Sequence, residues 1–444
     1  MTWHKCHINN NATHHLLSLT GFALILFSAF TLNEHSSFPG YNALYPVVGT
    51  VLLIISSKGI VNSLLSIKPI VYLGAISYSL YLWHWPILVF ARYIAIDMTL
   101  LTKIICIILT FILSIFSYHF VEQKFRFSAS HSFKSAFVKM YFIPTLFFIL
   151  VAVIGISNNG FSGRFSQEIV HQEAALHTFA NESRKGCHSS LRQRDVLPSD
   201  TCAFAVPLSE SSSKFFIFGD SHANHLVPFF EALATEAITT GIDYTLDRCL
   251  PIFNLAWGSN TYKANECKMR NDQARQYIES KNFNYVVLAA SWPGITTKRI
   301  FNKEKITNPV KVKEVFTLQL IETLEIIQNT GAIPILVYDT PTLEGNSPNC
   351  TIKKALYNSS LECSIKSNNN AFLKEVVATV KNQFPLLIEI DVQKVMCEEK
   401  TCSMELDGVP LFRDEDHLNE IGAKVLADEY SKQFQNPFLK SKIK

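Results

Sequence analysis

Hydrophobic residues are spread unevenly along the chain. Long apolar stretches fill the first 157 residues, at about 15–31, 42–57, 70–95, 104–121 and 139–157. A helix needs about 20 apolar residues to cross a bilayer, so these stretches predict five membrane spans, although the second is short for a span. We therefore expect a helical transmembrane domain over residues 1–157.

The pattern changes after residue 157. Residues 158–212 are polar and predict a linker or extension, and residues 213–444 alternate short β-rich runs with helical stretches. The expected strands are 214–218, 244–247, 285–290, 333–338 and 387–390, and the expected helices are 225–237, 310–329, 370–382 and 418–432. Such alternation predicts a parallel sheet with helices on both faces. The expected fold class is multi-domain: a transmembrane helical bundle followed by a three-layer α/β domain.

Loop charges predict how the spans are oriented. One set of loops carries seven basic residues: Lys5, Lys58, Lys68, Lys124, Arg126, Lys134 and Lys139. The other set carries only Arg92 and Lys103. Since Lys and Arg accumulate in cytoplasmic loops, this difference predicts a cytoplasmic N-terminus. Five spans would then place the domain after residue 157 outside the cytoplasm.

Eight cysteines of the second part give an independent indication of the compartment. They form four sequence-local pairs: 187/202, 249/267, 350/363 and 397/402. Even numbers of cysteines outside the membrane predict disulfides and an oxidising compartment, although the sequence does not fix which cysteines pair. The net charge of +3 is too balanced to indicate a nucleic-acid partner.

One motif in the second part has the features of a nucleophile. The run Gly219-Asp220-Ser221-His222 directly follows the expected strand 214–218. A glycine permits a tight turn from strand to helix, which would place Ser221 at the carboxyl edge of the sheet, where ligands bind. The backbone N–H of Ser221, at the start of the helix, is a candidate oxyanion donor. The alternative is structural, because Asp-Ser before a helix is also a capping signal.

A second motif, Asp414-Glu415-Asp416-His417, stands just before the last expected helix. An aspartate three residues before a histidine reaches its ring within one turn, so Asp414 could orient His417 while His417 deprotonates a serine. Asp416 is the second choice for this partner. Alternatively, the two aspartates cap the helix and His417 is a surface residue. No spacing among these groups requires a metal, and His222 is expected to be a local packing residue.

Together and in this order, the two motifs resemble those of the SGNH (GDSL-like) hydrolase superfamily. The resemblance covers the expected α/β domain and implies that Ser221 is the nucleophile, His417 the general base and Asp414 its partner. The superfamily also uses an asparagine in its oxyanion hole. After "NYVVLAA", where it is expected, this chain has Ser291-Trp292-Pro293-Gly294, which leaves the further oxyanion donors open. Trp292 is either a platform for a sugar or a core residue.

Three motifs in the first part resemble the closing spans of the acyltransferase-3 family. They are "FPGYNALYPVVGT", "ISYSLYLWHWPILVF" and "VEQKFR", and the resemblance covers about residues 15–127. It makes His84 and Glu122 candidate functional residues. The alternatives are an aromatic belt in which a neighbouring helix satisfies His84, and a helix-end charge pair at Glu122. Family members begin with a span that carries an arginine and a histidine, and they have about ten spans. We therefore expect either a truncated or split gene, or a separate chain that supplies the first half.

The two resemblances imply a bacterial inner-membrane O-acyltransferase that acetylates a surface polysaccharide such as lipopolysaccharide O-antigen, with the catalytic domain in the periplasm. They imply acetyl-CoA as the acyl donor, no bound cofactor, and contacts with membrane lipids and the polysaccharide acceptor. The alternatives are a membrane-tethered periplasmic carbohydrate acetyl esterase, with water as acceptor, and an inactive product of a truncated or split gene.

Overall fold

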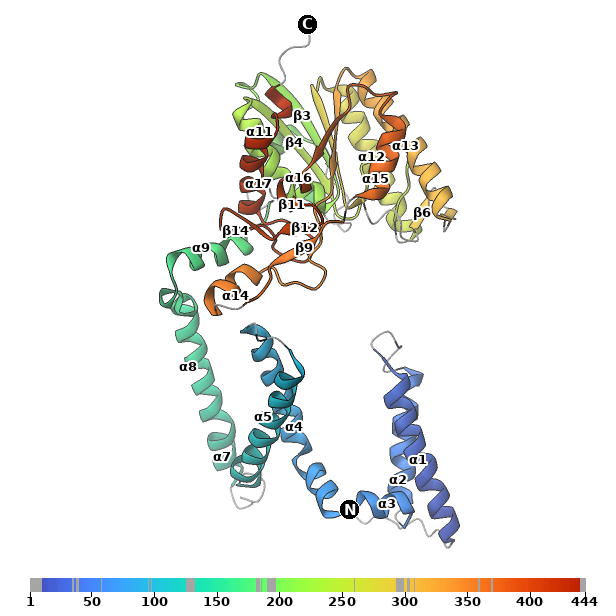
Figure 1. Cartoon of the computed structure of the whole chain (residues 1–444), viewed down its shortest axis with the longest axis vertical. Helices are drawn as coiled ribbons and strands as arrows, with labels where there is room; N and C mark the ends of the chain where they lie inside the picture. The colour runs from blue at the N-terminus through green and yellow to red at the C-terminus, as the bar shows by residue number, and fades with distance from the viewer. Residues whose placement is uncertain are drawn as a thin grey trace. The chain divides into compact units, whose positions relative to one another are not determined.

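The computed structural model describes residues 10–33, 36, 40–56, 58–94, 96, 98–124, 132–180, 184, 186–189, 197–258, 260–292, 299–301, 304–306, 308–357, 360–368 and 370–439. The chain divides into two compact units, 1–149 and 150–444. Figure 1 labels the elements of both units.

Four helices in the described part of the chain are long and apolar enough to cross a membrane. They are α1 (Asn11–Thr31), α4 (Lys68–Tyr93), the helix Leu100–Glu122 that begins with α5 (Leu100–Ser117), and the helix Phe133–Ser157 that ends with α8 (Ile143–Ser157). The expected second span is shorter: a 3-10 turn (Tyr41–Ala43) leads into α2 (Leu44–Ile55). At 1.5 Å per residue, these 12 residues of α2 reach about 18 Å, less than the roughly 30 Å hydrocarbon core.

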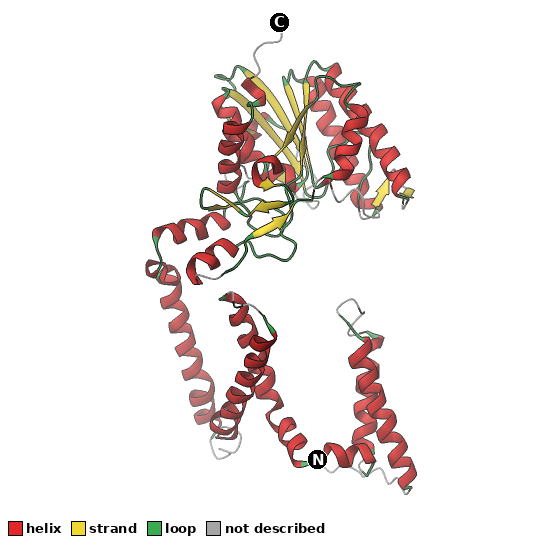
Figure 2. Ribbon diagram, in the orientation of Figure 1, coloured by secondary structure: helices red, strands yellow, loops and turns green. Residues whose placement is uncertain are grey.

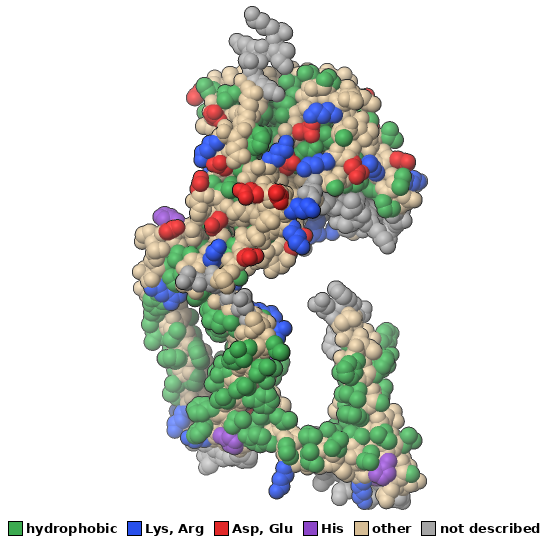
Figure 3. Space-filling view, in the orientation of Figure 1, with side chains coloured by type: hydrophobic (Ala, Val, Ile, Leu, Met, Phe, Trp, Pro, Cys, Tyr) green, Lys and Arg blue, Asp and Glu red, His purple; other side chains and the backbone are tan. Residues whose placement is uncertain are grey.

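Helices of the first unit pack in pairs. Gly21 of α1 faces Gly49 of α2 so closely that a Cβ on Gly21 would lie 2.6 Å from the carbonyl oxygen of Gly49. Small residues permit this approach of two helix backbones. The second pair is α4 and α5 with its extension, where the hydroxyl of Tyr72 lies 3.0 Å from Nε2 of His119. Figure 3 shows hydrophobic side chains over the outer surfaces of these helices, as expected for contact with lipid. The chain is thus a membrane protein.

The second unit is built on a seven-stranded sheet, which confirms the predicted α/β class. Its order is β1-β4-β3-β5-β8-β10, all parallel, with β2 antiparallel on β4. Figure 2 shows the sheet between layers of helices. The strands are β1 (His188–Ser189), β2 (Ala203–Ala205), β3 (Ser213–Gly219), β4 (Thr239–Leu246), β5 (Tyr285–Ala289), β8 (Ile333–Tyr338) and β10 (Ile388–Asp391).

Apolar side chains of the sheet form two cores, one on each face. On one face lie α11 (Val227–Glu236) and α17 (Glu420–Gln433). On the other lie α12 (Thr261–Ser280), α13 (Pro309–Asn329) and α15 (Ala371–Val380). The sequence pattern did not predict α12, because its buried positions include the polar residues Arg270 and Asn271.

Smaller elements complete the unit beside the carboxyl ends of the strands. They are α9 (Gln167–Leu176), α14 (Cys350–Tyr357), α16 (Gln393–Met396), β6 (Arg299–Phe301), β7 (Glu304–Ile306), β9 (Ser364–Lys366), β11 (Cys397–Glu398), β12 (Thr401–Ser403), β13 (Glu405–Leu406) and β14 (Val409–Pro410). One of them, α9, belongs to the expected linker. In that segment α9 packs beside β14 and α14, and β1 and β2 join the main sheet, so its described parts are folded rather than extended.

The eight cysteines form four disulfides between sequence neighbours. The pairs are Cys187–Cys202, Cys249–Cys267, Cys350–Cys363 and Cys397–Cys402. The structure thus gives the connectivity that the sequence left open. Disulfides persist in oxidising compartments, so they support an extracytoplasmic location for this unit.

The strand order fixes where a ligand site is expected. From β3 the chain passes to β4 on one side and then returns to β5 on the other side of β3. In open α/β sheets, ligands bind outside the carboxyl ends of the strands at such a switch point. The residues that follow β3 therefore occupy the expected position of a site.

Candidate active site

The turn after β3 presents Ser221. Gly219 has φ +156°, and a Cβ at this position would lie 1.8 Å from the carbonyl oxygen of Ala289. Asp220 is the N-cap of the short helix α10 (Ser221–His225). Its Oδ1 accepts a hydrogen bond from the backbone N–H of His222, at 2.8 Å, and its Oδ2 accepts one from that of Ser291, at 3.0 Å. Because Asp220 does the capping, the hydroxyl of Ser221 is left for another partner.

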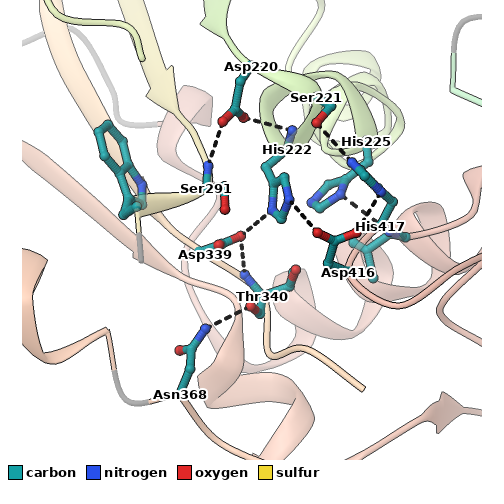
Figure 4. Close-up of polar contacts among 12 residues, drawn as sticks. Asp220, Ser221, His222, His225, Ser291, Asp339, Thr340, Asn368, Asp416 and His417 are labelled. Atoms are coloured by element: carbon teal, nitrogen blue, oxygen red, sulfur yellow. Dashed lines mark hydrogen bonds and ion pairs between the residues drawn. The ribbon is translucent and has the colours of Figure 1, made fainter. Parts of the chain in front are cut away.

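That partner is His417. Its Nε2 lies 2.9 Å from Oγ of Ser221. Its Nδ1 lies 2.9 Å and 3.1 Å from the two carboxylate oxygens of Asp414 in hydrogen-bond geometry. Oδ1 of Asp416 also lies 2.9 Å from Nδ1, as an ion-pair contact. Figure 4 shows the histidine between the serine and the Asp416 carboxylate. The structure therefore brings the three predicted residues together, with both candidate aspartates at the same ring nitrogen.

The loop before α17 holds His417 in place. The backbone N–H of Arg413 donates to the carbonyl of His417 at 3.0 Å, which closes a tight turn. Within this turn, Oδ1 of Asp414 accepts from the backbone N–H of His417 at 2.8 Å. Asn419 caps α17 by accepting from the N–H of Gly422 at 2.6 Å. The position of the imidazole is thus set by hydrogen bonds on both sides in the sequence.

The carboxylates tune the acid–base behaviour of His417. Burial by itself lowers the pKa of His417, but hydrogen bonds to Asp414 and Asp416 raise it above its usual value. The pKa of Asp414 shows the opposite balance: partial burial raises it, but the hydrogen bond and charge of His417, together with backbone hydrogen bonds from Asp416 and His417, lower it below its usual value. Hydrogen bonds from His222 and His417 lower the pKa of Asp416. Both aspartates are therefore ionised at neutral pH and can stabilise a protonated His417.

A second histidine–aspartate pair lies beside these residues. Nδ1 of His222 lies 2.7 Å from Oδ1 of Asp339, with both side chains buried. On its other side, Nε2 of His222 lies 3.6 Å from Oδ2 of Asp416. The expectation of a mere packing role for His222 is therefore incomplete. The sequence signal for Asp339 was its place directly after β8, since polar residues that end parallel strands line sites of this kind.

Trp292 is a core residue. Its side chain is 1% exposed, and its indole N–H donates to the carbonyl of Val337 at 2.7 Å. A platform for a sugar must be open on one face, so burial corrects the suggestion that Trp292 stacks on substrate. Pro293 and Gly294, which follow it in the segment expected to hold the oxyanion asparagine, lie outside the described residues.

Two possible oxyanion donors are engaged elsewhere. The backbone N–H groups of His222 and Ser291 both point to Asp220. Ala289, two residues before Ser291, pairs with Gly219 of β3. The backbone N–H of Ser221 remains the candidate donor on the side of the nucleophile.

The candidate residues of the first unit lie on α4 and its partner helix. Nδ1 of His84 lies 2.6 Å from the carbonyl oxygen of Tyr81 in the same helix. The ring lines an apolar cavity of about 350 Å³ between α4 and α5. A carboxylate oxygen of Glu122 accepts from the hydroxyl of Ser79 on α4 at 3.4 Å. The alternative for His84 invoked a neighbouring helix, whereas the contact described is within its own helix.

One trio of side chains has the spacing of a metal site. Ligand atoms of His222, Asp416 and His417 all lie within 4.8 Å of one another. The same atoms take part in the ion pairs between the two histidines and Asp416. These contacts join the three side chains in one network of charged groups.

Comparison with known proteins identifies both parts of the chain. A family model described as "SGNH domain (fused to AT3 domains)" matches residues 186–432, and one described as "Acyltransferase domain" matches residues 7–119. The O-acetyltransferase OatA of Staphylococcus aureus (strain NCTC 8325 / PS 47) is 32% identical over 135 residues, which are 29% of this chain and 21% of that protein.

Two further relatives have similar limits. The putative peptidoglycan O-acetyltransferase YrhL of Bacillus subtilis (strain 168) is 28% identical over 127 residues, or 27% of this chain and 20% of that protein. The match thus spans about a fifth of the length of these curated relatives. The solved periplasmic domain of the lipopolysaccharide acetyltransferase of Salmonella ser. Paratyphi A is 15% identical, with a TM-score of 0.41, and the match covers 60% of this chain and 97% of that domain.

Proposed function

Because the chain belongs to the family of SGNH domains that are fused to AT3 domains, we propose that it is a bacterial O-acyltransferase that acetylates a cell-surface polysaccharide through an acyl-enzyme on Ser221. The observation that carries the proposal is the 2.9 Å contact between Nε2 of His417 and Oγ of Ser221, with aspartates at Nδ1 of the same ring. This is the arrangement of a serine nucleophile, its general base and the group that orients the base.

The reaction has two halves that use the same residues. Oγ of Ser221 attacks the acyl carbonyl of the donor while Nε2 of His417 takes its proton. The leaving group then departs with that proton, and an ester on Ser221 remains. In the second half His417 takes the proton of a sugar hydroxyl, whose oxygen attacks the ester. Ser221 leaves as its alcohol when His417 returns the proton, and the acetyl group stays on the sugar.

A positive and a negative charge develop around this pair, and the chain has groups that can stabilise each. Asp414 and Asp416 stabilise the imidazolium form of His417 that arises in both halves. The tetrahedral intermediate places its charge on the former carbonyl oxygen. The backbone N–H of Ser221, at the first position of α10, is the donor we assign to that oxygen.

The membrane unit would supply the acyl group. Residues 7–119 match the acyltransferase model, and relatives that match part of this chain are named as an O-acetyltransferase and a putative peptidoglycan O-acetyltransferase. We propose acetyl-CoA as the donor on the cytoplasmic side, with His84 and Glu122 as residues of the membrane unit that take part in the transfer. A separate chain with further spans would complete this unit.

The proposed location is the bacterial inner membrane, with the N-terminus in the cytoplasm and the second unit in the periplasm. The disulfides of the second unit support its exposure to an oxidising compartment. The basic residues of the loops predicted to be cytoplasmic support a cytoplasmic N-terminus. The acceptor would then be a polysaccharide such as lipopolysaccharide O-antigen that passes through the periplasm.

A second candidate function is a membrane-tethered acetyl esterase of carbohydrates. It is favoured by one observation: Ser221, His417 and both aspartates belong to the second unit, so hydrolysis needs no residue of the membrane unit. Water would then take the place of the sugar hydroxyl. The two functions differ only in the acceptor, because the acyl-enzyme is the same.

The experiment that tests the proposal compares cells that express the wild-type chain with cells that express Ser221→Ala, each with a complete acyltransferase-3 partner. Surface polysaccharide is purified and its O-acetyl content is measured by NMR. The proposal predicts acetylation above the level of cells without the chain, and its loss in Ser221→Ala. Equal acetylation in both strains would contradict it. If the wild-type chain lowers acetylation below the level of cells without the chain, and Ser221→Ala does not, the result would favour the esterase.

A further inference from the structure

The pair of His222 and Asp339 is unusual because both side chains are buried. They are 4% and 2% exposed, and Nδ1 of His222 lies 2.7 Å from Oδ1 of Asp339. Buried ion pairs add little net stability, since the cost of removing two charges from water offsets their attraction. A role other than stability is therefore to be sought for this pair.

The backbone around Asp339 is held from several directions. Its carbonyl oxygen accepts from the side-chain amides of Asn370, at 2.9 Å, and of Gln393, at 2.6 Å. The next carbonyl, that of Thr340, accepts from the side chain of Asn368 at 3.0 Å. In addition, the N–H of Thr340 donates to the Asp339 carboxylate itself at 2.9 Å. The anion that faces His222 thus has a fixed position.

On its other side, His222 faces the candidate catalytic residues. Its Nε2 lies 3.6 Å from Oδ2 of Asp416, and Oδ1 of the same carboxylate lies 2.9 Å from Nδ1 of His417. The two imidazole rings are 4.9 Å apart between their centroids. Figure 4 shows Asp416 between the two histidines and Asp339 on the far side of His222. A continuous path of charged groups therefore leads from the end of β8 to the base.

We propose that His222 is a positioning residue that acts through Asp416: fixed by Asp339 on one side, it holds the Asp416 carboxylate against Nδ1 of His417 on the other. The inference rests on the proposed function, because it assigns His222 a part in the same reaction. Two carboxylates at one nitrogen favour the imidazolium, which cannot act as a base. A positive charge on the neighbouring His222 offsets this effect and keeps His417 neutral, so that it can accept a proton.

The charged and titratable groups around both rings agree with this assignment. Around His222 they are Asp220, Asp339, Asp416, His225 and His417, and around His417 they are Asp414, Asp416, His222, His225 and, farther off, Asp247. Burial by itself lowers the pKa of His222, but Asp339 and then Asp416 and Asp220 raise it well above its usual value. The charge of His222 in turn lowers the pKa of His417.

His225 provides a matched control. It lies on the same helix, is fully buried, and its ring centroid is 5.8 Å from that of His417. Burial and the charges of His222 and His417 hold the pKa of His225 well below its usual value, so it is neutral. Its Nδ1 accepts from the backbone N–H of Leu418 at 3.3 Å, and a glutamine side chain also offers an acceptor there.

The test uses the full-length protein in detergent micelles and its hydrolysis of 4-nitrophenyl acetate, measured as kcat/KM against pH. The acid limb of this profile reports the pKa of the free base. His222→Gln keeps a hydrogen-bond donor but removes the charge. We expect its acid limb to move upward by about one pH unit, as for loss of a unit charge about 5 Å away. His225→Gln should leave the limb where it is.

Two further variants keep the test decisive if His222→Gln folds poorly. Asp339→Asn removes the anion that holds the charge on His222, so its acid limb should also move upward. Asp416→Asn removes a carboxylate that favours the imidazolium, so its limb should move downward. We expect His222→Gln to lower the plateau value of kcat/KM by about tenfold. In the double variant with Asp416→Asn, the losses of the two single variants should not add up, because both changes break the same path.

The outcomes separate the inference from the proposed function. Ser221-dependent hydrolysis with unmoved acid limbs in His222→Gln and Asp339→Asn would overturn the role of His222 and leave the serine mechanism standing. An equal shift in His225→Gln would also overturn it, because the effect would not come from the charge of His222. Absence of any Ser221-dependent hydrolysis in the wild type would overturn both.

Discussion

Nε2 of His417 lies 2.9 Å from Oγ of Ser221, although 196 positions separate the two residues in the chain. One stands at the end of the central strand β3 and the other in the loop before the last helix, α17. The contact therefore forms only when the sheet and its covering helices have folded together.

The two aspartates at Nδ1 of His417 are expected to contribute unequally. Asp414 accepts a hydrogen bond from the ring and is held by backbone N–H groups of its own loop, whereas Asp416 makes an ion-pair contact. We expect Asp414→Asn to lower kcat for ester hydrolysis by about 100-fold or more, and Asp416→Asn by less.

A double variant provides the control for this ranking. With both carboxylates replaced, no anion remains at Nδ1, so the rate should fall below that of either single variant. A double variant as active as Asp416→Asn would contradict the role of Asp414. Comparison of the disulfide content and thermal unfolding of each variant separates loss of activity from loss of fold.

The pH dependence of activity follows from the raised pKa of His417. The base must be neutral to take the proton of Ser221, so activity should fall as pH drops through this pKa. The acid limb of kcat/KM is therefore expected above the usual value of 6.5 for histidine. An acid limb well below 6.5 would contradict the assignment of His417 as base.

The stability that His222 and His417 contribute should fall as pH rises, whereas activity should fall as pH drops. The folded pKa values of His222 and His417 are raised above the unfolded ones. Their contribution to stability is therefore complete below pH 6.5 and is lost as pH rises through the folded values. We expect the difference in Tm between wild type and His222→Gln to be larger at about pH 6 than at about pH 9.

Gly219 is predicted to tolerate no side chain. A Cβ there would lie 1.8 Å from the carbonyl oxygen of Ala289 on the neighbouring strand. We expect Gly219→Ala to lower the free energy of unfolding by about 3 kcal/mol or more, or to prevent folding. Gly163→Ala is the matched control, because nothing lies within 4 Å of a Cβ added there. Equal unfolding curves for the two variants would contradict the account of this turn.

The orientation of the membrane unit is open to a direct test. If α2 crosses the membrane, five spans place the N-terminus in the cytoplasm and the second unit outside. If α2 is too short to cross, four spans place both on the same side. We expect reporter fusions after Lys58 to give a cytoplasmic signal and fusions after Ser157 a periplasmic one. Signals from the same compartment at both points would contradict the proposed topology.

Much of the site was predictable because its signals are local. Gly219 and Ser221 follow an apolar strand directly, and Asp414 and His417 are three residues apart before a helix. Such short spacings can be read from the sequence without knowledge of the rest of the fold. The four cysteine pairs were visible for the same reason, since each joins neighbours in the chain.

What the sequence did not reveal depends on distant packing. Asp339 meets His222 only because β8 lies two strands from β3 in the sheet. The helix α12 buries Arg270 and Asn271, so its inner face lacks an apolar pattern. The two residues of β1 are too few to show the alternation of side chains that indicates a strand. They are recognised as a strand only by their pairing with β4. The burial of Trp292 likewise depends on its partner Val337, which belongs to another strand.

The most direct test of the central claim is to look for an acetyl group on Ser221. The full-length protein, in detergent and with its disulfides formed, is mixed with a chromogenic acetyl ester, quenched in acid and digested for mass spectrometry. The account predicts an acetylated peptide that contains Ser221, and neither this peptide nor ester turnover in Ser221→Ala. Turnover that persists in Ser221→Ala, or acetylation at another residue alone, would contradict it.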